Sequence, residues 1–227
     1  MQKDDWLSSV VARNCFTVLE SDVNKIQASD LREDAFYTCR IRSRANQKRL
    51  VLELGFRFIL SEVELVGDFW ARPKLSSVVE IRRANRLDQD RVCEIASESF
   101  RYDRFHFDAQ IDQHKANQIK ERWVAAAFSC ESEKDLWIAE LRNDVAGFCL
   151  TVRSPDIVRI DLIAVAAGFT GNGIAKSLVA SLPHCLKEER LTVLAGTQEH
   201  NVESLRLYDR IGMKKSQVKD VYHRGYF

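Results

Sequence analysis

The sequence of 227 residues has no excess of charge, no membrane-spanning run and no secretion signal. Lysine and arginine number 34 against 33 acidic residues, a formal net charge of +1, so nothing marks a surface for nucleic acid. No apolar run approaches the roughly 18 to 20 residues that cross a bilayer. The N-terminus, MQKDDWLSS, lacks a signal-peptide pattern. We therefore expect a cytoplasmic protein that binds neither nucleic acid nor a membrane.

The cysteines do not indicate a metal site. The chain has six of them, far apart and without a C-x-x-C pair. Most stand among apolar residues, which is typical of buried, reduced thiols in the cytoplasm. A zinc site is therefore not indicated, and we expect no metal.

The most informative stretch spans residues 159–180, RIDLIAVAAGFTGNGIAKSLVA. Its first part, 159–165, is rich in β-branched and apolar residues and predicts a strand. The three glycines in 166–173 predict a tight loop, and the apolar spacing from Ile174 predicts a helix. Backbone N–H groups at such a loop and helix start favour phosphate. Taken alone, the pattern fits an ordinary tight turn equally well.

Two common phosphate-binding motifs are not matched. The Rossmann fingerprint needs G-x-G-x-x-G, but Lys176 occupies the third glycine position. The acidic residues Glu188 and Glu189 precede a predicted strand instead of ending one. A Walker loop is excluded because the chain has no G-K-[ST].

The residues that follow extend the pattern. Residues 191–198, LTVLAGTQ, predict another strand, and a helix follows from about Asn201 to Arg210. The combination resembles the GCN5-related N-acetyltransferase (GNAT) family, whose core is a strand, [RQ]-x-x-G-x-[GA] and a helix. The hexad here is TGNGIA, 170–175, with Thr170 where the family usually has Arg or Gln. A second family element, N-x-x-[AS]-x-x-x-Y-x-x-x-G-[FM], is matched by Asn201, Ser204, Tyr208, Gly212 and Met213.

This resemblance covers about residues 80–227 and implies a mixed α/β sheet of the α+β type with acetyl-CoA as cosubstrate. A splay between strands 159–165 and 191–198 would admit the pantetheine arm, and the amides of 170–175 would cradle the pyrophosphate. Tyr208 would be the general acid that protonates the leaving thiolate. The residues implied in cofactor binding are Ile163, Ala164, Val165, Thr170, Gly171, Asn172, Gly173, Ile174, Ala175 and Asn201.

The first part of the chain predicts a smaller α/β unit. Strands are expected at 15–19 and 35–41, a helix at 45–54, and either one strand or a bent pair of strands at 56–66. The helix–glycine joint at 50–56 resembles the one at 207–213. It is either a coincidence or the trace of a truncated GNAT-like copy that has lost the tyrosine. The linker-like residues 73–78 separate the expected domains, 1–75 and 76–227.

Residues 99–128 combine aromatic residues and arginines with a predicted helix over 113–128. Packing under a loop would explain the aromatics, whereas arginines among them also suit a flat, phosphorylated ligand. With the segment 96–105 and the aromatic tail 222–227, this region resembles family members that acetylate nucleotide-linked amino sugars such as dTDP-fucosamine. The acceptor side would then include Arg101, Arg104, Phe105 and His106.

We therefore expect an N-acetyltransferase acting on a nucleotide-linked 4-amino-4,6-dideoxy sugar in surface polysaccharide synthesis. The general base stays open among Asp103, His106, Glu199 and His200. Acetylation of a protein or small-molecule amine, or non-catalytic binding of acyl-CoA, are the alternatives. The sequence leaves open whether two chains form a homodimer.

Overall fold

The computed structural model describes residues 1–71, 79–129, 132–155 and 157–227. Its centre is a mixed sheet of ten strands in the order β1-β2-β3-β10-β4-β9-β8-β7-β6-β5. The pairs β2–β3 and β8–β9 are parallel and the others are antiparallel. The expected mixed sheet of the α+β type is confirmed.

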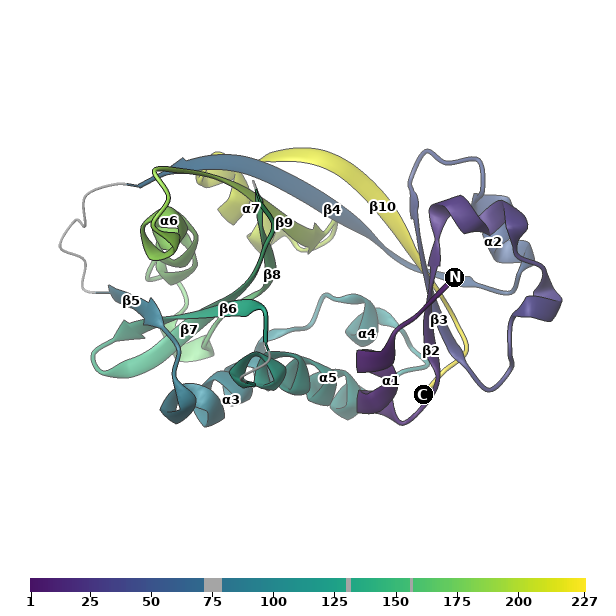
Figure 1. The fold of residues 1–227 in the computed structure, drawn as a ribbon, viewed down its shortest axis with the longest axis horizontal. Coiled ribbons are helices and arrows are strands. Elements are labelled where there is room, and N and C mark those ends of the chain that lie inside the picture. The colour runs from purple at the N-terminus through teal and green to yellow at the C-terminus, as the bar shows by residue number, and fades with distance from the viewer. Residues whose placement is uncertain (72–78, 130–131, 156) are drawn as a thin grey trace.

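The N-terminal elements form one end of the molecule (Figure 1). Asp4 caps the first helix, since its carboxylate accepts from the Leu7 N–H at 2.9 Å. The predicted helix 45–54 is shorter than expected, because residues 43–47 turn before it begins at Lys48. The elements are β1 (Gln2–Lys3), α1 (Asp5–Val11), β2 (Cys15–Leu19), β3 (Phe36–Arg42) and α2 (Lys48–Glu53).

Two long strands connect this end of the molecule to the other. Strand β4 (Arg57–Trp70) is one continuous strand between β10 (Lys214–Arg224) and β9 (Arg190–Gln198). Strand β10 also pairs with β3, so the sheet passes from one end to the other without a break (Figure 1). The expected boundary between 1–75 and 76–227 lies outside the described residues, and the two-domain division stays a prediction.

The remaining elements, β5 to α7, include both strands and helices. In the hairpin at 142–144, Arg142 and Asn143 adopt positive φ, 56° and 67°, as a two-residue hairpin turn requires. The elements are β5 (Val79–Arg83), α3 (Gln89–Ser99), α4 (Arg104–Phe107), α5 (Gln113–Ala125), β6 (Lys134–Leu141), β7 (Asp144–Arg153), β8 (Ile157–Val165), α6 (Ile174–Leu186) and α7 (Val202–Arg210).

Helices cover both faces of this part of the sheet. Helix α6 buries Leu178 and Leu182 in the same core as Tyr208 of α7. Helices α3 and α5 pack on the opposite face, against Leu162 and Ala164 of β8. Because side chains alternate along a strand, β8 contributes to both cores. None of the helices in the described ranges is long and apolar enough to cross a membrane.

Candidate active site

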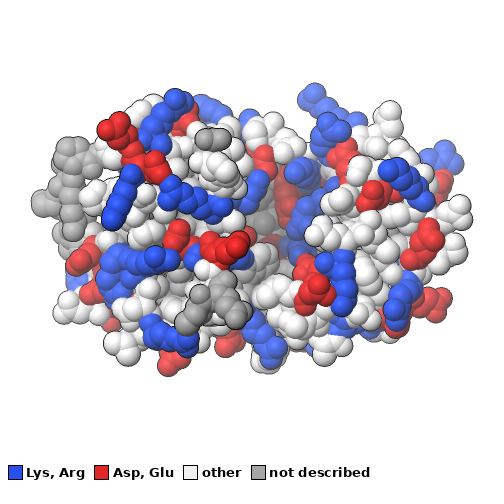
Figure 2. Space-filling view, in the orientation of Figure 1, with Lys and Arg blue, Asp and Glu red and all other residues white. Residues whose placement is uncertain are grey.

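A cavity of about 960 Å³ lies where strands β8 and β9 part. The parallel pairing of these strands runs only from Ile157 opposite Thr192 to Ile160 opposite Ala195. Beyond that point, residues of both strands line the cavity, among them Ile163, Val165 and Gly196. The surface is hollowed near the middle of the molecule, with basic and acidic side chains around the hollow (Figure 2). The strands therefore diverge where the resemblance to the GNAT family implies a splay.

The backbone of β8 is open to the cavity at two positions. The Ala166 N–H donates to the Ala146 carbonyl at 2.9 Å, which fixes the alternation of the antiparallel ladder with β7. By that alternation Ala164 faces β7, whereas Ile163 and Val165 turn their N–H and C=O groups towards β9. Strand β9 does not pair with them there. These groups are placed to bind an amide-containing chain in the manner of an added strand.

The glycine loop ends in a helix start without a side-chain cap. Gly171 and Gly173 have φ of 81° and 72°, and Gly173 is the N-cap of α6. A Cβ at either glycine would meet nothing within 4 Å. The Asn172 amide donates to Phe169 and Thr170 carbonyls, and the Thr170 hydroxyl to Ala167 O, so these side chains brace the loop. The free N–H groups can therefore take an anion.

The other two predicted residues at this end of α6 play different parts. Ile174 is buried in the core against the sheet, so its side chain anchors the helix. Ala175 lines the cavity beside Thr170. A bound pyrophosphate would thus contact the backbone of this turn more than its side chains.

Tyr208 stands in the cavity wall on α7 and is 2% exposed. Burial, together with the nearby Cys149 thiol, raises the pKa of Tyr208 above its usual value. The phenol therefore stays protonated at neutral pH and has a proton to donate. Asn201 caps the same helix, because its side-chain oxygen accepts from the Ser204 N–H at 3.1 Å, and it also lines the cavity.

The predicted acceptor residues lie in two environments. Arg101 is exposed and Arg104 is buried, and both line the cavity together with Phe105. The Arg104 guanidinium donates to the Thr38 hydroxyl at 2.8 Å, and Phe105 lies in the core between α5 and the C-terminus. His106 is not among the lining residues. Its ring nitrogens lie 2.5 Å from Asp103 and 2.8 Å from the Asn117 carbonyl oxygen.

Of the other candidates for the general base, only Asp103 lines the cavity. Burial would raise its pKa, but the charge of Lys120 and the hydrogen bond to His106 hold the pKa of Asp103 well below its usual range. Its carboxylate is 3.5 Å from the Lys120 ammonium. Glu199 is exposed outside the cavity, and His200 packs on the Phe107 ring with centroids 4.0 Å apart.

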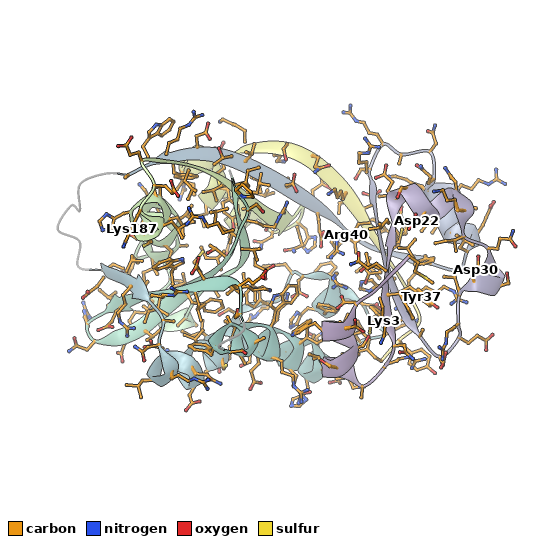
Figure 3. All side chains as sticks on the ribbon, in the orientation of Figure 1. Lys3, Asp22, Asp30, Tyr37, Arg40 and Lys187 are labelled. Carbon is orange, nitrogen blue, oxygen red and sulfur yellow. The ribbon has the colours of Figure 1, made fainter. Side chains whose placement is uncertain are left out.

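Sequence reasoning missed most of the charged residues in the cavity wall, among them Arg40, Glu62 and Lys120. Arg40 of β3 pairs with Glu62 of β4 at 2.9 Å, and Lys120 of α5 faces Asp103. The side chain of Arg40 lies near the middle of the molecule (Figure 3). The only sequence signal was a charge inside an apolar strand or helix face, and nothing local shows that the three meet.

Comparison with known proteins identifies the family. Residues 90–213, more than half of the chain, match the acetyltransferase (GNAT) family. The chain belongs to this family. Acetyl-CoA is the acyl donor that enzymes of this family use. Within the described ranges, no group of three or more His, Cys, Asp and Glu side chains is arranged to hold a metal ion.

One similar protein has a named pathway. The chain is 34% identical over 139 residues to the spore coat polysaccharide biosynthesis protein SpsD of Bacillus subtilis, covering 60% of this chain and 47% of SpsD. The chain thus spans about half the length of this relative.

Solved structures show the fold. A functionally unknown conserved protein from Staphylococcus epidermidis matches with a TM-score of 0.61 at 14% identity, over 86% of this chain and 74% of its own. A GNAT protein from Sphaerobacter thermophilus matches with a TM-score of 0.58 at 17% identity, over 84% and 59%. The fold assigned from the sequence is confirmed.

Proposed function

We propose that the chain transfers an acetyl group from acetyl-CoA to the 4-amino group of a nucleotide-linked 4-amino-4,6-dideoxy sugar. The product would enter surface polysaccharide synthesis from the cytoplasm. The observation that carries the proposal is a single cavity with Tyr208 in one wall and Arg101 and Arg104 in another. A reacting amine and an anionic remainder of the same acceptor can therefore be bound together.

The cofactor side would be held mainly by backbone groups. The free N–H and C=O groups of Ile163 and Val165 suit the amides of a pantetheine arm. The turn at 170–175, with positive φ at Gly171 and Gly173, suits the pyrophosphate. Acetyl-CoA would supply an activated acyl group, and this chain would supply its orientation.

The chemistry needs a proton donor for the leaving thiolate. In direct transfer the neutral amine attacks the acetyl carbonyl, the C–S bond breaks, and the sulfur leaves with the electron pair. Tyr208 would donate its phenolic proton to that sulfur. Tyr208 would later regain a proton from solvent, and water would carry away the proton that the amine loses.

Two observations support a nucleotide-linked sugar as the acceptor: the arginines that line the cavity and the similarity to SpsD. Guanidinium groups bind phosphoryl oxygens in a bidentate manner, so Arg101 and Arg104 suit a nucleotide-linked acceptor. SpsD is described as a spore coat polysaccharide biosynthesis protein, which favours a sugar over a peptide.

The test is thiol release from acetyl-CoA with dTDP- and UDP-linked 3-amino and 4-amino sugars, beside simple amines and peptides. We expect release with a nucleotide-linked 4-amino sugar and a product heavier by one acetyl group. Release only with peptides or free amines would refute the sugar acceptor. Tight binding of acetyl-CoA without release for any acceptor would favour a non-catalytic acyl-CoA-binding module.

A further inference from the structure

Arg104 is a buried cation that lacks a carboxylate partner among the described residues. It is 8% exposed, and its guanidinium contacts only neutral acceptors: the Thr38 hydroxyl at 2.8 Å and the His223 ring at 3.5 Å. His223 is neutral, because its Nδ1 donates to Asp108 and burial lowers its pKa to about 4. Burying a charge without a counter-charge is costly.

The neighbouring carboxylates are already engaged. Glu62 pairs with Arg40 at 2.9 Å, and Asp103 faces Lys120 at 3.5 Å. Burial, and secondly the charge of Arg40, lower the pKa of Arg104 to about 9, as expected for a cation in this setting. The Asp4 carboxylate also acts on the charge of Arg104, but it accepts from the Leu7 N–H as the cap of α1. Among the described residues, Arg40 and Lys120 each have a carboxylate within ion-pair distance, whereas Arg104 has none.

Arg104 is also held in place. Its guanidinium carbon lies 3.9 Å from the centre of the Phe105 ring, and Thr38 orients one of its nitrogens. Arg40, which lies in the same wall and near the middle of the molecule (Figure 3), adds a second guanidinium from β3. A fixed, planar donor with an unmet charge that faces a large cavity is suited to a phosphoryl group.

We propose that Arg104, with Arg40 and Lys120 beside it, binds the diphosphate of the acceptor. The inference rests on the proposed function and deepens it. It assigns a binding role to the N-terminal part of the chain, since Arg40 and the supporting Thr38 both belong to β3. The site is distinct from the turn at 170–175, which would hold the pyrophosphate of acetyl-CoA.

The test is the rise in melting temperature caused by UDP, dTDP or pyrophosphate, measured with saturating CoA so that the cofactor turn is occupied. The wild-type protein should gain roughly 5 to 10 °C at about 100 times Kd. Arg104→Met should lose the response, yet melt no lower than the wild type without ligand, because an uncompensated buried charge is removed. Arg122→Met removes an exposed charge outside the cavity and should respond like the wild type.

Several results would overturn the inference. If the nucleotides raise the melting temperature only when CoA is left out, they bind at the cofactor turn. If they still raise it in Arg104→Met, the anion binds elsewhere. A response to glucuronate but not to the nucleotides would refute a phosphoryl ligand. If Arg104→Met does not fold, Arg104→Lys must weaken nucleotide binding at least fivefold, and unchanged affinity would contradict the proposal.

The two proposals can fail separately. Acetyl transfer to a nucleotide amino sugar with unchanged KM in Arg104→Met would leave the proposed function and remove the site. Binding of the nucleotides through Arg104, without transfer to any nucleotide-linked amine, would leave the site and remove the proposed reaction.

Discussion

Tyr208 is buried and also lines the cavity, and both properties bear on its proposed role as a general acid. Burial keeps the phenol protonated, since its pKa is raised. Its place in the cavity wall would give the proposed acid access to the reacting atoms. From the sequence alone Tyr208 was also compatible with a core tyrosine, and only its spacing from Asn201 and Gly212 favoured a role in catalysis.

Replacing Tyr208 tests that role. In Tyr208→Phe we expect kcat to fall by about 100-fold, the lower end of general-acid effects, while KM for acetyl-CoA changes less than about threefold because the fold loses only a hydroxyl. The measurement is steady-state thiol release. Tyr102→Phe, a half-exposed tyrosine in the same cavity, is the matched control and should keep its kcat. A wild-type kcat in Tyr208→Phe would rule out this proton donor.

The lowered pKa of the buried His223 predicts that the stability of the protein depends on pH. Burial lowers the pKa of His223 to about 4, whereas an unfolded histidine has a pKa of about 6.5. Between these values the unfolded chain binds more protons, so the free energy of unfolding falls as pH falls from about 6.5 to about 4, by roughly 3 kcal/mol in total. Urea unfolding at pH 7 and pH 4.5 measures the change. His223→Gln should have a shallower dependence, and an identical one would contradict this account.

At the scale of elements, the glycines in the loop before α6 differ in backbone φ. Gly173 has φ of 72° and Gly168 does not lie in the left-handed region, yet an added Cβ has room at both. A side chain at positive φ costs about 1 to 2 kcal/mol, so only one of them should resist substitution.

We therefore expect Gly173→Ala to raise KM for acetyl-CoA roughly tenfold, because about 1.4 kcal/mol is lost in forming the turn that holds the cofactor. Gly168→Ala should change KM less than about twofold. Initial rates at varied acetyl-CoA, with acceptor saturating, make the comparison. Equal KM values for the two variants would show that this turn does not hold the cofactor.

Most elements were predictable from local pattern. The strands at 15–19 and 191–198 and the helix from Ile174 were confirmed, because alternation, helical spacing and glycine punctuation are all local signals. The helix 45–54 was too long by three residues at its start, since the turn at 43–47 carries no glycine or proline to mark it.

For the whole molecule, the place of β4 was not predictable. It pairs with β9 and β10, at least 120 residues away along the chain, and no local signal specifies such partners. The same limit applies to the charged wall, where Arg40, Lys120 and Arg104 come from three elements. Motif spacing predicted the residues that we propose for the cofactor side, whereas the proposed acceptor side depends on contacts distant in sequence.

This arrangement predicts that the C-terminal part does not fold alone. A fragment of residues 79–227 would lose β3 and β4, which leaves β10 without a partner strand and β9 as an exposed edge. We expect it to be insoluble or to lack a cooperative thermal transition by circular dichroism. Co-expression with residues 1–75 as a separate chain should restore both. A fragment that melts cooperatively by itself would show that the two parts are independent domains.

The most direct test of the central claim compares one amino sugar with and without its nucleotide. The measurement is kcat/KM for acetyl transfer to a nucleotide-linked 4-amino-4,6-dideoxy sugar and to the methyl glycoside of the same sugar. If the cavity binds amine and diphosphate together, the glycoside should be poorer by at least about 100-fold, or about 2.7 kcal/mol of lost binding energy in the transition state. Equal values for the two acceptors would contradict the assignment of a nucleotide-linked substrate.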